Sequence, residues 1–258
     1  MGPGEAVHRA ANRPQPARIS GAIRVREFPM ASAATPQPEL TPASDQNVAT
    51  ARKAMIDSQL RPSGISDARI LAAMASAPRE QYVAADQRSI AYMDRSVPLG
   101  EGRSLTAPFA QAMLLQTARP VETDKALLIG GATGYLAALL APMVATLDVV
   151  EPATRLASIA GSKAGDWHDG PLDQGHPRNG PYDLIVIDGA VEKLPPAIGS
   201  QLAAGGRLVT GVVERGVTRI AIGRKAGTAA DAPVALQTLA ETGMPVLAEF
   251  KEEKGWSF

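Results

Sequence analysis

Apolar residues recur at helical spacing in three segments of the first half of the chain. The first runs over residues 48–60 and ends at the turn sequence RPSG. The second, GISDARILAAMASAP, offers Ser66 or Asp67 as an N-cap and ends at Pro78. The third is APFAQAMLLQTA. Its spacing predicts one shared face made of Phe109, Ala112, Met113 and Gln116.

From Lys125 onward, apolar runs of strand length alternate with a glycine turn and a helix. KALLI is followed by the turn, by the helical segment YLAALLAPM and by the strand TLDVV, which Glu151 closes. This order predicts a βαβ unit. The run YDLIVIDGA is apolar almost throughout, which is typical of a central parallel strand, and GGRLVTGVV and VTRIAIGRK follow it. We therefore expect an α/β fold with a doubly wound, mainly parallel, Rossmann-like sheet, and a ligand beyond the carboxyl ends of its strands.

Composition divides the chain into two parts. Residues 1–44 are rich in Pro, Ala, Ser and Gln and show no apolar period, so we predict a disordered N-terminal extension. Residues 45–258 are predicted to form a single domain, with a helical N-terminal part (45–120) and a sheet part (121–258).

The charge balance and the residue types narrow the classes of partner. The chain has 26 basic and 26 acidic residues, so it lacks the positive field that draws proteins to nucleic acid or to anionic membranes. It has no cysteine, and its three histidines are too dispersed for a recognisable metal site. No apolar run reaches the roughly 18 residues of a membrane helix, and no apolar segment typical of a secretory signal follows the first basic residues. We expect a cytoplasmic protein without a metal, whose partner is a small ligand or a protein; the sequence leaves its oligomeric state open.

The sequence LLIGGATGY places Gly130, Gly131 and Gly134 in the turn after the first strand. Such a turn lets a ligand approach the backbone, although any tight strand-to-helix turn also favours glycine. A P-loop would need lysine after Gly134, where the chain has Tyr135, and a dinucleotide site would need glycine in place of Ala132. The remaining interpretation is S-adenosylmethionine, a nucleoside ligand without phosphates.

An acidic residue stands where a ribose-binding carboxylate is expected. Glu151 follows the second strand, 151 − 130 = 21 residues after Gly130. Ribose-binding acids follow the glycine turn by roughly 20 residues in nucleotide-binding α/β sheets. The alternative is that Glu151 supplies a negative charge to the start of a helix in EPATRL.

An ordered set of motifs between residues 48 and 215 resembles the protein-L-isoaspartate O-methyltransferase family. In chain order these are RKAMIDSQL, GISDARILAAM, PREQYV, AYMDRSVPLGEGRSLTAPFAQAM, LLIGGATGY, PYDLIVIDGA and QLAAGGRLV. The segment SVPLGEGRSLTAPF is the most specific, because it is similar to the family's P-I-G-x-G-x-T-I-S-x-P. Two motifs depart from the family pattern. Its T-I-S becomes Ser104-Leu105-Thr106, and its E-I-G-T-G-S-G has Leu128 in place of the acid and Ala132 in place of the central glycine.

The resemblance implies a class I methyltransferase for protein repair. Such an enzyme moves the methyl group of S-adenosylmethionine to the α-carboxylate of L-isoaspartyl residues in damaged proteins. That carboxylate is ionised at neutral pH, with an unperturbed pKa of about 4, so no general base is expected. Catalysis would consist of positioning the two reactants in line.

The resemblance also implies a role for each site residue. Thr106 would orient the acceptor carboxylate as the catalytic and substrate-binding residue, unless it caps the following helix. Tyr92 would line the peptide groove, unless it serves only as a packing aromatic. The cofactor-binding residues would be Gly130, Ala132 and Gly134 under the methionine part, Glu151 at the ribose, and Asp169 with Gly170 at the adenine.

Two other functions stay open at the level of sequence. Leu128 and Ala132 are compatible with a homologue that kept the fold and acts as a binding module. Thr106, together with Asp188 at the end of a central strand, is compatible with a methyltransferase for a different acceptor.

Overall fold

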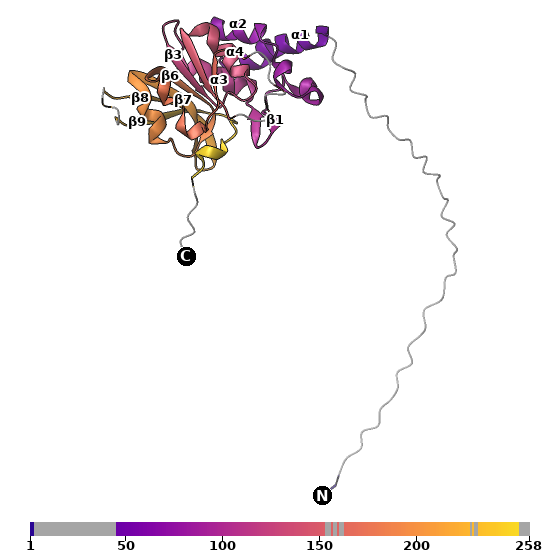
Figure 1. The fold of residues 1–258 in the computed structure, drawn as a ribbon. Coiled ribbons are helices and arrows are strands. Elements are labelled where there is room, and N and C mark those ends of the chain that lie inside the picture. The colour runs from indigo at the N-terminus through magenta and orange to yellow at the C-terminus, as the bar shows by residue number, and fades with distance from the viewer. Residues whose placement is uncertain are drawn as a thin grey trace. The chain divides into compact units, whose positions relative to one another are not determined.

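The computed structural model describes residues 1–2, 45–152, 156, 159, 163–227, 229 and 232–252 of the chain (Figure 1). Contacts divide the chain into two units, Met1–Leu40 and Thr41–Phe258. All helices and strands that the structure describes belong to the second unit. Nearly all of the expected N-terminal extension lies outside the described residues, so its disorder and the domain boundary at residue 45 stay predictions.

A seven-stranded sheet is the centre of the second unit, in the order β5-β4-β3-β6-β7-β8-β9 (Figure 1). The strands from β5 to β7 in this order run parallel, and β8 and β9 are antiparallel additions at one edge. The expected doubly wound, mainly parallel fold is confirmed. The strands are β3 (Lys125–Ile129), β4 (Thr146–Val150), β5 (Asp166–His168), β6 (Tyr182–Val191), β7 (Leu202–Glu214), β8 (Val217–Lys225) and β9 (Val234–Glu241).

The central strands are buried on both faces, as their apolar sequences predict. In β3, Leu127 belongs to one apolar cluster and Leu128 to the other, because successive side chains of a strand point to opposite faces. In β6, Ile185 and Val186 divide in the same way. Both faces of the sheet therefore contribute to the core, and polar residues at the strand ends become the places where chemistry can reach solvent.

Helices and short turns pack around this sheet, and a separate hairpin, β1 (Val97–Gly100) paired with β2 (Arg103–Leu105), lies outside it. The α-helices are α1 (Asp45–Ala54), α2 (Ala68–Ser76), α3 (Pro108–Ala118), α4 (Tyr135–Leu140) and α5 (Pro196–Ser200). A π-helical stretch, η1 (Met55–Leu60), extends α1. The short 3₁₀ turns are η2 (Arg79–Tyr82), η3 (Ala85–Ile90), η4 (Ala141–Met143), η6 (Leu172–Gln174), η7 (Pro177–Asn179) and η8 (Ala248–Phe250).

The start of α2 confirms one local prediction, and the burial of α3 corrects another. Asp67 is the N-cap of α2, and its side chain accepts a hydrogen bond from the Arg69 amide. On α3, however, Phe109 and Met113 are only half-buried, whereas the other side of the helix is fully covered. The helix lies between the strands β6 to β8 on one side and η1 with α2 on the other, so a single apolar face was the wrong expectation.

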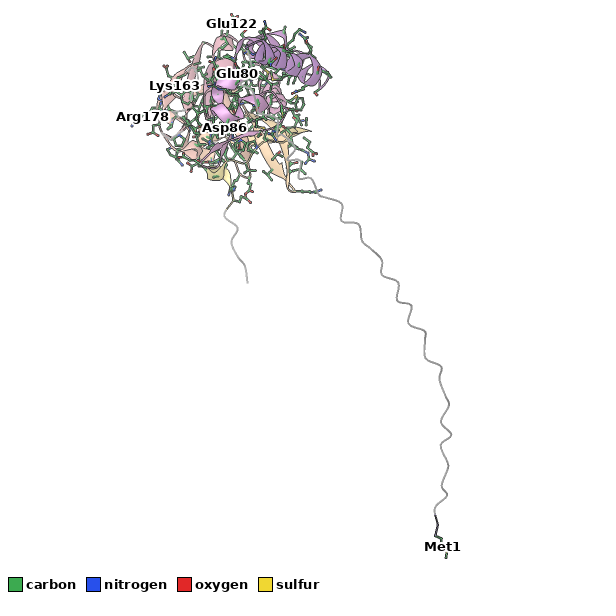
Figure 2. The ribbon with its side chains drawn as sticks, turned by 90° about the vertical axis from the view of Figure 1, so that its right-hand side faces the viewer. Met1, Glu80, Asp86, Glu122, Lys163 and Arg178 are labelled. Atoms are coloured by element: carbon green, nitrogen blue, oxygen red, sulfur yellow. The ribbon has the colours of Figure 1, made fainter. Side chains whose placement is uncertain are left out.

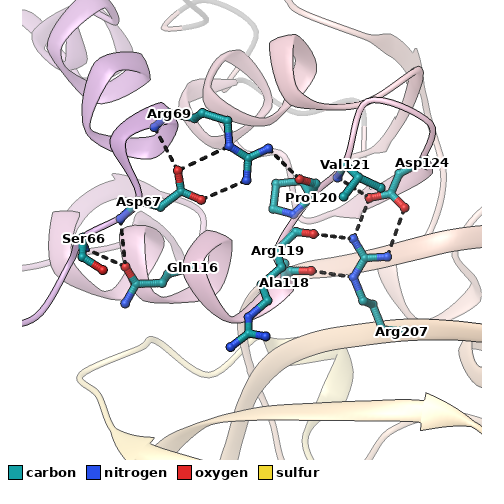
Figure 3. A network of polar contacts seen from close by, with 10 residues as sticks. All are labelled: Ser66, Asp67, Arg69, Gln116, Ala118, Arg119, Pro120, Val121, Asp124 and Arg207. Carbon is teal, nitrogen blue, oxygen red and sulfur yellow. Dashed lines mark hydrogen bonds and ion pairs between the residues drawn. The ribbon is translucent and has the colours of Figure 1, made fainter.

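A polar network fixes the amino ends of the parallel strands (Figure 3). Arg207 on β7 makes a two-pronged ion pair with Asp124, with distances of 3.0 and 2.6 Å between Nη1 and Oδ1 and between Nη2 and Oδ2. Its Nε and Nη2 also donate to the carbonyl oxygens of Ala118 and Arg119. Nearby, Gln116 accepts a hydrogen bond from the Ser66 amide at 2.8 Å. The network joins α2 and α3 to the sheet at the end opposite to the glycine turn.

Charged side chains of both signs lie on the surface that Figure 2 shows. Asp86, Glu122, Lys163 and Arg178 are all exposed there. This mixture agrees with the net charge of zero, and it produces no electrostatic field of a single sign around these side chains. Among the described residues, no helix combines the length and the apolar character that crossing a bilayer requires.

Candidate functional site

The glycine turn between β3 and α4 is tightly folded and keeps left-handed backbone at three positions. The φ angles are 83° at Gly130, 47° at Ala132 and 99° at Gly134. A Cβ atom added at Gly131 would lie 2.9 Å from the Trp167 ring, so no larger residue fits there. Alanine in the left-handed region costs about 1 kcal/mol or more. The turn has thus kept the conformation of a glycine at Ala132 and stores strain there.

Glu151 leaves β4 beside this turn and is anchored through one oxygen. Its Oε2 accepts hydrogen bonds from the Ala132 amide and from Nη2 of Arg103, both at 2.8 Å. Its Oε1 is buried and makes no hydrogen bond with any residue that the structure describes. Burial raises the pKa of the Glu151 carboxyl, although Arg103 and the Ala132 amide oppose that rise. The carboxylate is therefore held in place with one oxygen still available for a ligand.

Arg103 is the functional candidate that sequence reasoning missed. It lies on β2, and only 9% of its side chain and 4% of that of its partner Glu151 are exposed. Its Nη2 approaches within 3.3 Å of the point where a Cβ on Gly130 would stand. Its Nε and Nη1 are buried and lack a hydrogen-bond partner within the described part of the chain. The sequence did contain a hint of this residue. A basic side chain directly follows the two glycines of the most family-like segment, at a position that the family pattern does not specify.

Thr106 directly follows β2, three residues after Arg103. It is fully buried, and its hydroxyl makes no hydrogen bond to the residues described by the structure. Ala107 is the N-cap of α3 and that helix has no side-chain cap, so the capping alternative for Thr106 is not what the contacts show. A buried hydroxyl without a partner is costly unless a ligand or water completes it.

Asp188, in the carboxyl-terminal half of β6, faces Thr106. Its Oδ2 accepts a hydrogen bond from Nε2 of Gln111 at 2.7 Å, and its Oδ1 has no partner among the described residues. Burial raises the pKa of the Asp188 carboxyl, against the lowering effect of the nearby Thr106 hydroxyl and Gln111 amide. The Thr106 hydroxyl is thus close to this carboxylate, but it does not meet it in regular hydrogen-bond geometry.

Arg79 supports this part of the site from below. It is fully buried, and its Nε, Nη1 and Nη2 donate to the Ala91 carbonyl, the Gln111 side chain and the Thr106 carbonyl at 2.7, 2.7 and 2.5 Å. Its guanidinium carbon also lies 4.7 Å from the centre of the Tyr135 ring. Gln111 therefore links Arg79 to Asp188, and the backbone of Thr106 is fixed by the same arginine.

The remaining predicted residues lie at two different places. Asp169 and Gly170 directly follow β5, next to β4, where the Glu151 amide donates to the His168 carbonyl at 3.2 Å. They are therefore near the expected ribose site. Tyr92, in contrast, is buried, and its hydroxyl donates to Glu80 and accepts from Nε of Arg52 at 2.8 Å. These contacts fit the packing alternative for Tyr92 rather than a groove wall.

The residues at the strand ends fit an adenosyl cofactor. Gly130 in positive φ lets a ligand lie close to the turn, and the free Oε1 of Glu151 can accept a ribose hydroxyl. Thr106 adds a hydroxyl with no described partner a short way along the chain from Arg103. In the fold class found here, ligands bind at this edge of the sheet.

Comparison with known sequences agrees with this arrangement. Residues 50–238 match the sequence model of the protein-L-isoaspartate(D-aspartate) O-methyltransferase family. The chain is 38% identical over 170 residues to the protein-L-isoaspartate O-methyltransferase of Koribacter versatilis, covering 61% of this chain and 74% of that protein. It is 39% identical over 165 residues to the enzyme of the same name from Roseiflexus castenholzii, covering 61% and 75%.

Solved structures are similar in fold. One protein-L-isoaspartate O-methyltransferase superimposes with a TM-score of 0.64 at 21% identity, over 76% of this chain and 66% of that one. A Plasmodium falciparum protein, described as a putative protein-L-isoaspartate O-methyltransferase in complex with S-adenosyl-L-homocysteine, gives 0.62 at 17% identity, over 77% and 98%.

Proposed function

The chain belongs to the protein-L-isoaspartate(D-aspartate) O-methyltransferase family, and from this we infer that it methylates the α-carboxylate of L-isoaspartyl residues in damaged proteins. S-adenosylmethionine is its methyl donor, and isoaspartyl proteins or peptides are its substrates. The interpretations as an inactive binding module or as a methyltransferase for another acceptor are not favoured. A cytoplasmic location and the absence of a nucleic-acid partner stay predictions of the sequence.

The geometry that best supports this function is the position of Glu151. Its Oε2 accepts a hydrogen bond from the Ala132 amide of the glycine turn, where the ends of β3 and β4 are adjacent. Its Oε1 has no partner among the described residues. We assign Glu151 to the ribose hydroxyls and Gly130, Ala132 and Gly134 to the floor under the methionine part. Asp169 and Gly170, which follow the next strand, are assigned to the adenine. Tyr92 is left out of the proposed site because Glu80 and Arg52 engage its hydroxyl.

The chain's own residues have little proton chemistry to perform. The cofactor supplies an electrophilic methyl group on a sulfonium sulfur. The acceptor carboxylate is already ionised at neutral pH, with an unperturbed pKa of about 4, so it attacks without a general base. The chain has to hold the cofactor, orient the carboxylate and exclude water. Orientation alone contributes on the order of 7 to 11 kcal/mol when two reactants are held in line.

Thr106 is assigned to orientation of the acceptor. Its hydroxyl has no partner in the described residues, and Arg79 donates a hydrogen bond to its carbonyl oxygen. A hydrogen bond to an ionised carboxylate is stronger than one between neutral groups. Thr106 is fully buried, so an acceptor can reach its hydroxyl only after a local movement of the residues that cover it.

The proposed function is tested with purified protein, isotopically labelled cofactor and a matched pair of peptides that differ only in an isoaspartyl or an aspartyl residue. We expect label in the isoaspartyl peptide and methanol release from its unstable ester, with neither for the aspartyl peptide. Equal labelling of both peptides would point to another acceptor. Cofactor binding without any labelling would favour the binding-module interpretation.

A further inference from the structure

We propose that Arg103 binds the carboxylate that accepts the methyl group, while it stays paired with Glu151. The proposal rests on the proposed function, and it adds a substrate-binding residue that determines specificity for a free carboxylate. Arg103 would be the residue that bridges the two halves of the site, because it already contacts the group assigned to the ribose.

The first support is the place of the guanidinium. Its Nη2 lies 2.8 Å from Oε2 of Glu151, and it also lies 3.3 Å from the point where a Cβ on Gly130 would stand. The main-chain oxygen of Asp188 is 3.6 Å from that same point. Burial raises the pKa of the Asp188 carboxyl, and the Arg103 charge is one of the nearby groups that oppose this rise. The guanidinium thus lies where the ends of β3, β4 and β6 meet, beside the residues assigned to the cofactor.

The second support is the unfinished hydrogen bonding of this side chain. Arg103 uses one nitrogen on one oxygen of Glu151, and its Nε and Nη1 are buried with no partner among the described residues. Leaving donors of a charged group buried and unpaired is costly. A carboxylate has the charge and the acceptor oxygens to complete them. Both reactants of the proposed reaction carry a carboxylate, the cofactor in its methionine part and the acceptor in its isoaspartyl residue. We assign Arg103 to the acceptor, because the glycine turn is already assigned to the methionine part.

Another buried arginine shows what a purely structural pair looks like in this protein. Arg207 meets both oxygens of Asp124, and its remaining donors reach the carbonyl oxygens of Ala118, Arg119 and Asp183. Its side chain is 12% exposed, similar to the 9% of Arg103. The two arginines are therefore matched in burial and charge, but they differ in how many of their nitrogen donors have a hydrogen-bond acceptor.

The free oxygen of Glu151 makes the two roles of Arg103 compatible. Because Arg103 and the Ala132 amide both use Oε2, Oε1 can accept a ribose hydroxyl without breaking the ion pair. During transfer, one carboxylate oxygen forms a bond to the methyl carbon, the bond from sulfur to that carbon breaks, and sulfur keeps the electron pair. No proton moves, so Arg103 can remain protonated and bound to the carboxylate throughout.

The test measures binding rather than turnover. A fluorescent isoaspartyl peptide is titrated with protein saturated with S-adenosylhomocysteine, and so is the same peptide with its free α-carboxylate replaced by a carboxamide. The wild-type protein is expected to prefer the carboxylate. In Arg103→Gln, binding of the isoaspartyl peptide should weaken about tenfold or more, which is the scale of one hydrogen bond to a charged group, while the carboxamide peptide should bind as before. Arg103→Lys should keep part of the preference.

Arg207→Gln is the matched control, because it removes an equally buried arginine from the far end of the sheet. It should leave the ratio of the two peptide affinities unchanged, even if it lowers the melting temperature. The stoichiometry of S-adenosylhomocysteine binding, measured by calorimetry, gives the folded fraction of every variant.

Three results would overturn the proposal. An unchanged preference for the carboxylate in Arg103→Gln and Arg103→Lys would make Arg103 only the counter-ion of Glu151. A gain in S-adenosylhomocysteine affinity without a change in peptide preference would make it a side chain that competes with the cofactor. If the wild-type protein neither prefers the carboxylate peptide nor methylates it, the proposed function and this inference both fail. If the wild-type protein methylates the peptide but the Arg103 variants keep the same preference, only this inference fails.

Discussion

Two buried arginines, Arg79 and Arg103, use their hydrogen-bond donors differently. Arg79 has all three nitrogens bonded, to two carbonyl oxygens and to Gln111. Arg103 has a single nitrogen bonded, to Glu151, and its other two are buried without described partners. The difference shows that burial and charge do not by themselves separate a structural arginine from a functional one. The number of donors that are hydrogen-bonded does so, because an incomplete set is costly unless a ligand or water completes it.

The same contrast holds for two carboxylates at β4. Asp148 accepts hydrogen bonds from His168, Asn179 and Tyr182. Burial alone would raise the pKa of Asp148, but these three partners together lower it. Glu151 is held through one oxygen, and burial raises its pKa. The structural carboxylate is thus stabilised in its ionised form, and the one at the site is not.

The largest effect is expected from Arg79→Gln. The shorter side chain cannot reach the Ala91 and Thr106 carbonyls or the side-chain oxygen of Gln111. Each buried acceptor left unsatisfied costs about 1 to 3 kcal/mol, so the unfolding free energy should fall by about 3 kcal/mol or more. Urea denaturation followed by circular dichroism measures it. Arg103→Gln is the comparison variant and should lose less, since Glu151 keeps the Ala132 amide. Equal losses in the two variants would remove the distinction between them.

A smaller effect, on turnover instead of stability, is expected from Thr106→Ala. The hydroxyl makes no described hydrogen bond within the protein, so its loss should leave the melting temperature nearly unchanged. Methylation of an isoaspartyl peptide should fall about tenfold to a hundredfold, the value of a hydrogen bond to a charged group.

Thr106→Ser is the control for this prediction, because it keeps the hydroxyl and removes only a methyl group. It should retain most of the methylation rate. Unchanged methylation in Thr106→Ala, at an unchanged affinity for S-adenosylhomocysteine, would exclude Thr106 from the site.

The two carboxylates should give pH dependences of opposite sign. The lowered pKa of Asp148 means that its stabilising contribution is present above the unfolded pKa of about 4 and is lost as the pH falls through the lower folded value. Asp148→Asn should therefore be less stable than wild type at neutral pH, and the difference should shrink in acid. The raised pKa of Glu151 costs stability as the pH rises from its unfolded value of about 4.3 through the folded one, so Glu151→Gln should gain on wild type over that range.

Thermal melts of the two variants from pH 3 to pH 7 measure both trends. Parallel curves for Asp148→Asn and Glu151→Gln would contradict the contrast between the two carboxylates.

The smallest effect is expected from Ala132→Gly. The φ of 47° at this residue is unfavourable for alanine, and glycine should relieve on the order of 1 kcal/mol of strain, part of which is offset by the greater entropy of the unfolded chain. Unfolding free energy should rise slightly, and S-adenosylhomocysteine should bind more tightly by calorimetry. A loss of affinity would mean that the turn needs the alanine methyl group.

Local patterns were sufficient for most of the architecture. Apolar runs such as KALLI and YDLIVIDGA predicted the central strands, and the prediction is confirmed by β3 and β6. Elements whose pattern depends on their neighbours were not found. The hairpin of β1 and β2 is only a few residues long, and β9 is an edge strand whose side chains alternate between half-buried and exposed. Its sequence VALQTLAE contains few large apolar residues to reveal it.

The sequence by itself determined the central strands and the longer helices, the glycine turn and an acid at the end of β4, because each is set by neighbouring residues or by a fixed spacing along the chain. The tertiary structure alone decided that Arg103 meets Glu151, 48 positions further along, and that Arg79 reaches Asp188 through Gln111. Such pairs form only when packing brings distant segments together and excludes water from them. That packing decides whether every hydrogen-bonding atom of a buried charged side chain has a partner, and no periodic pattern in the sequence predicts it.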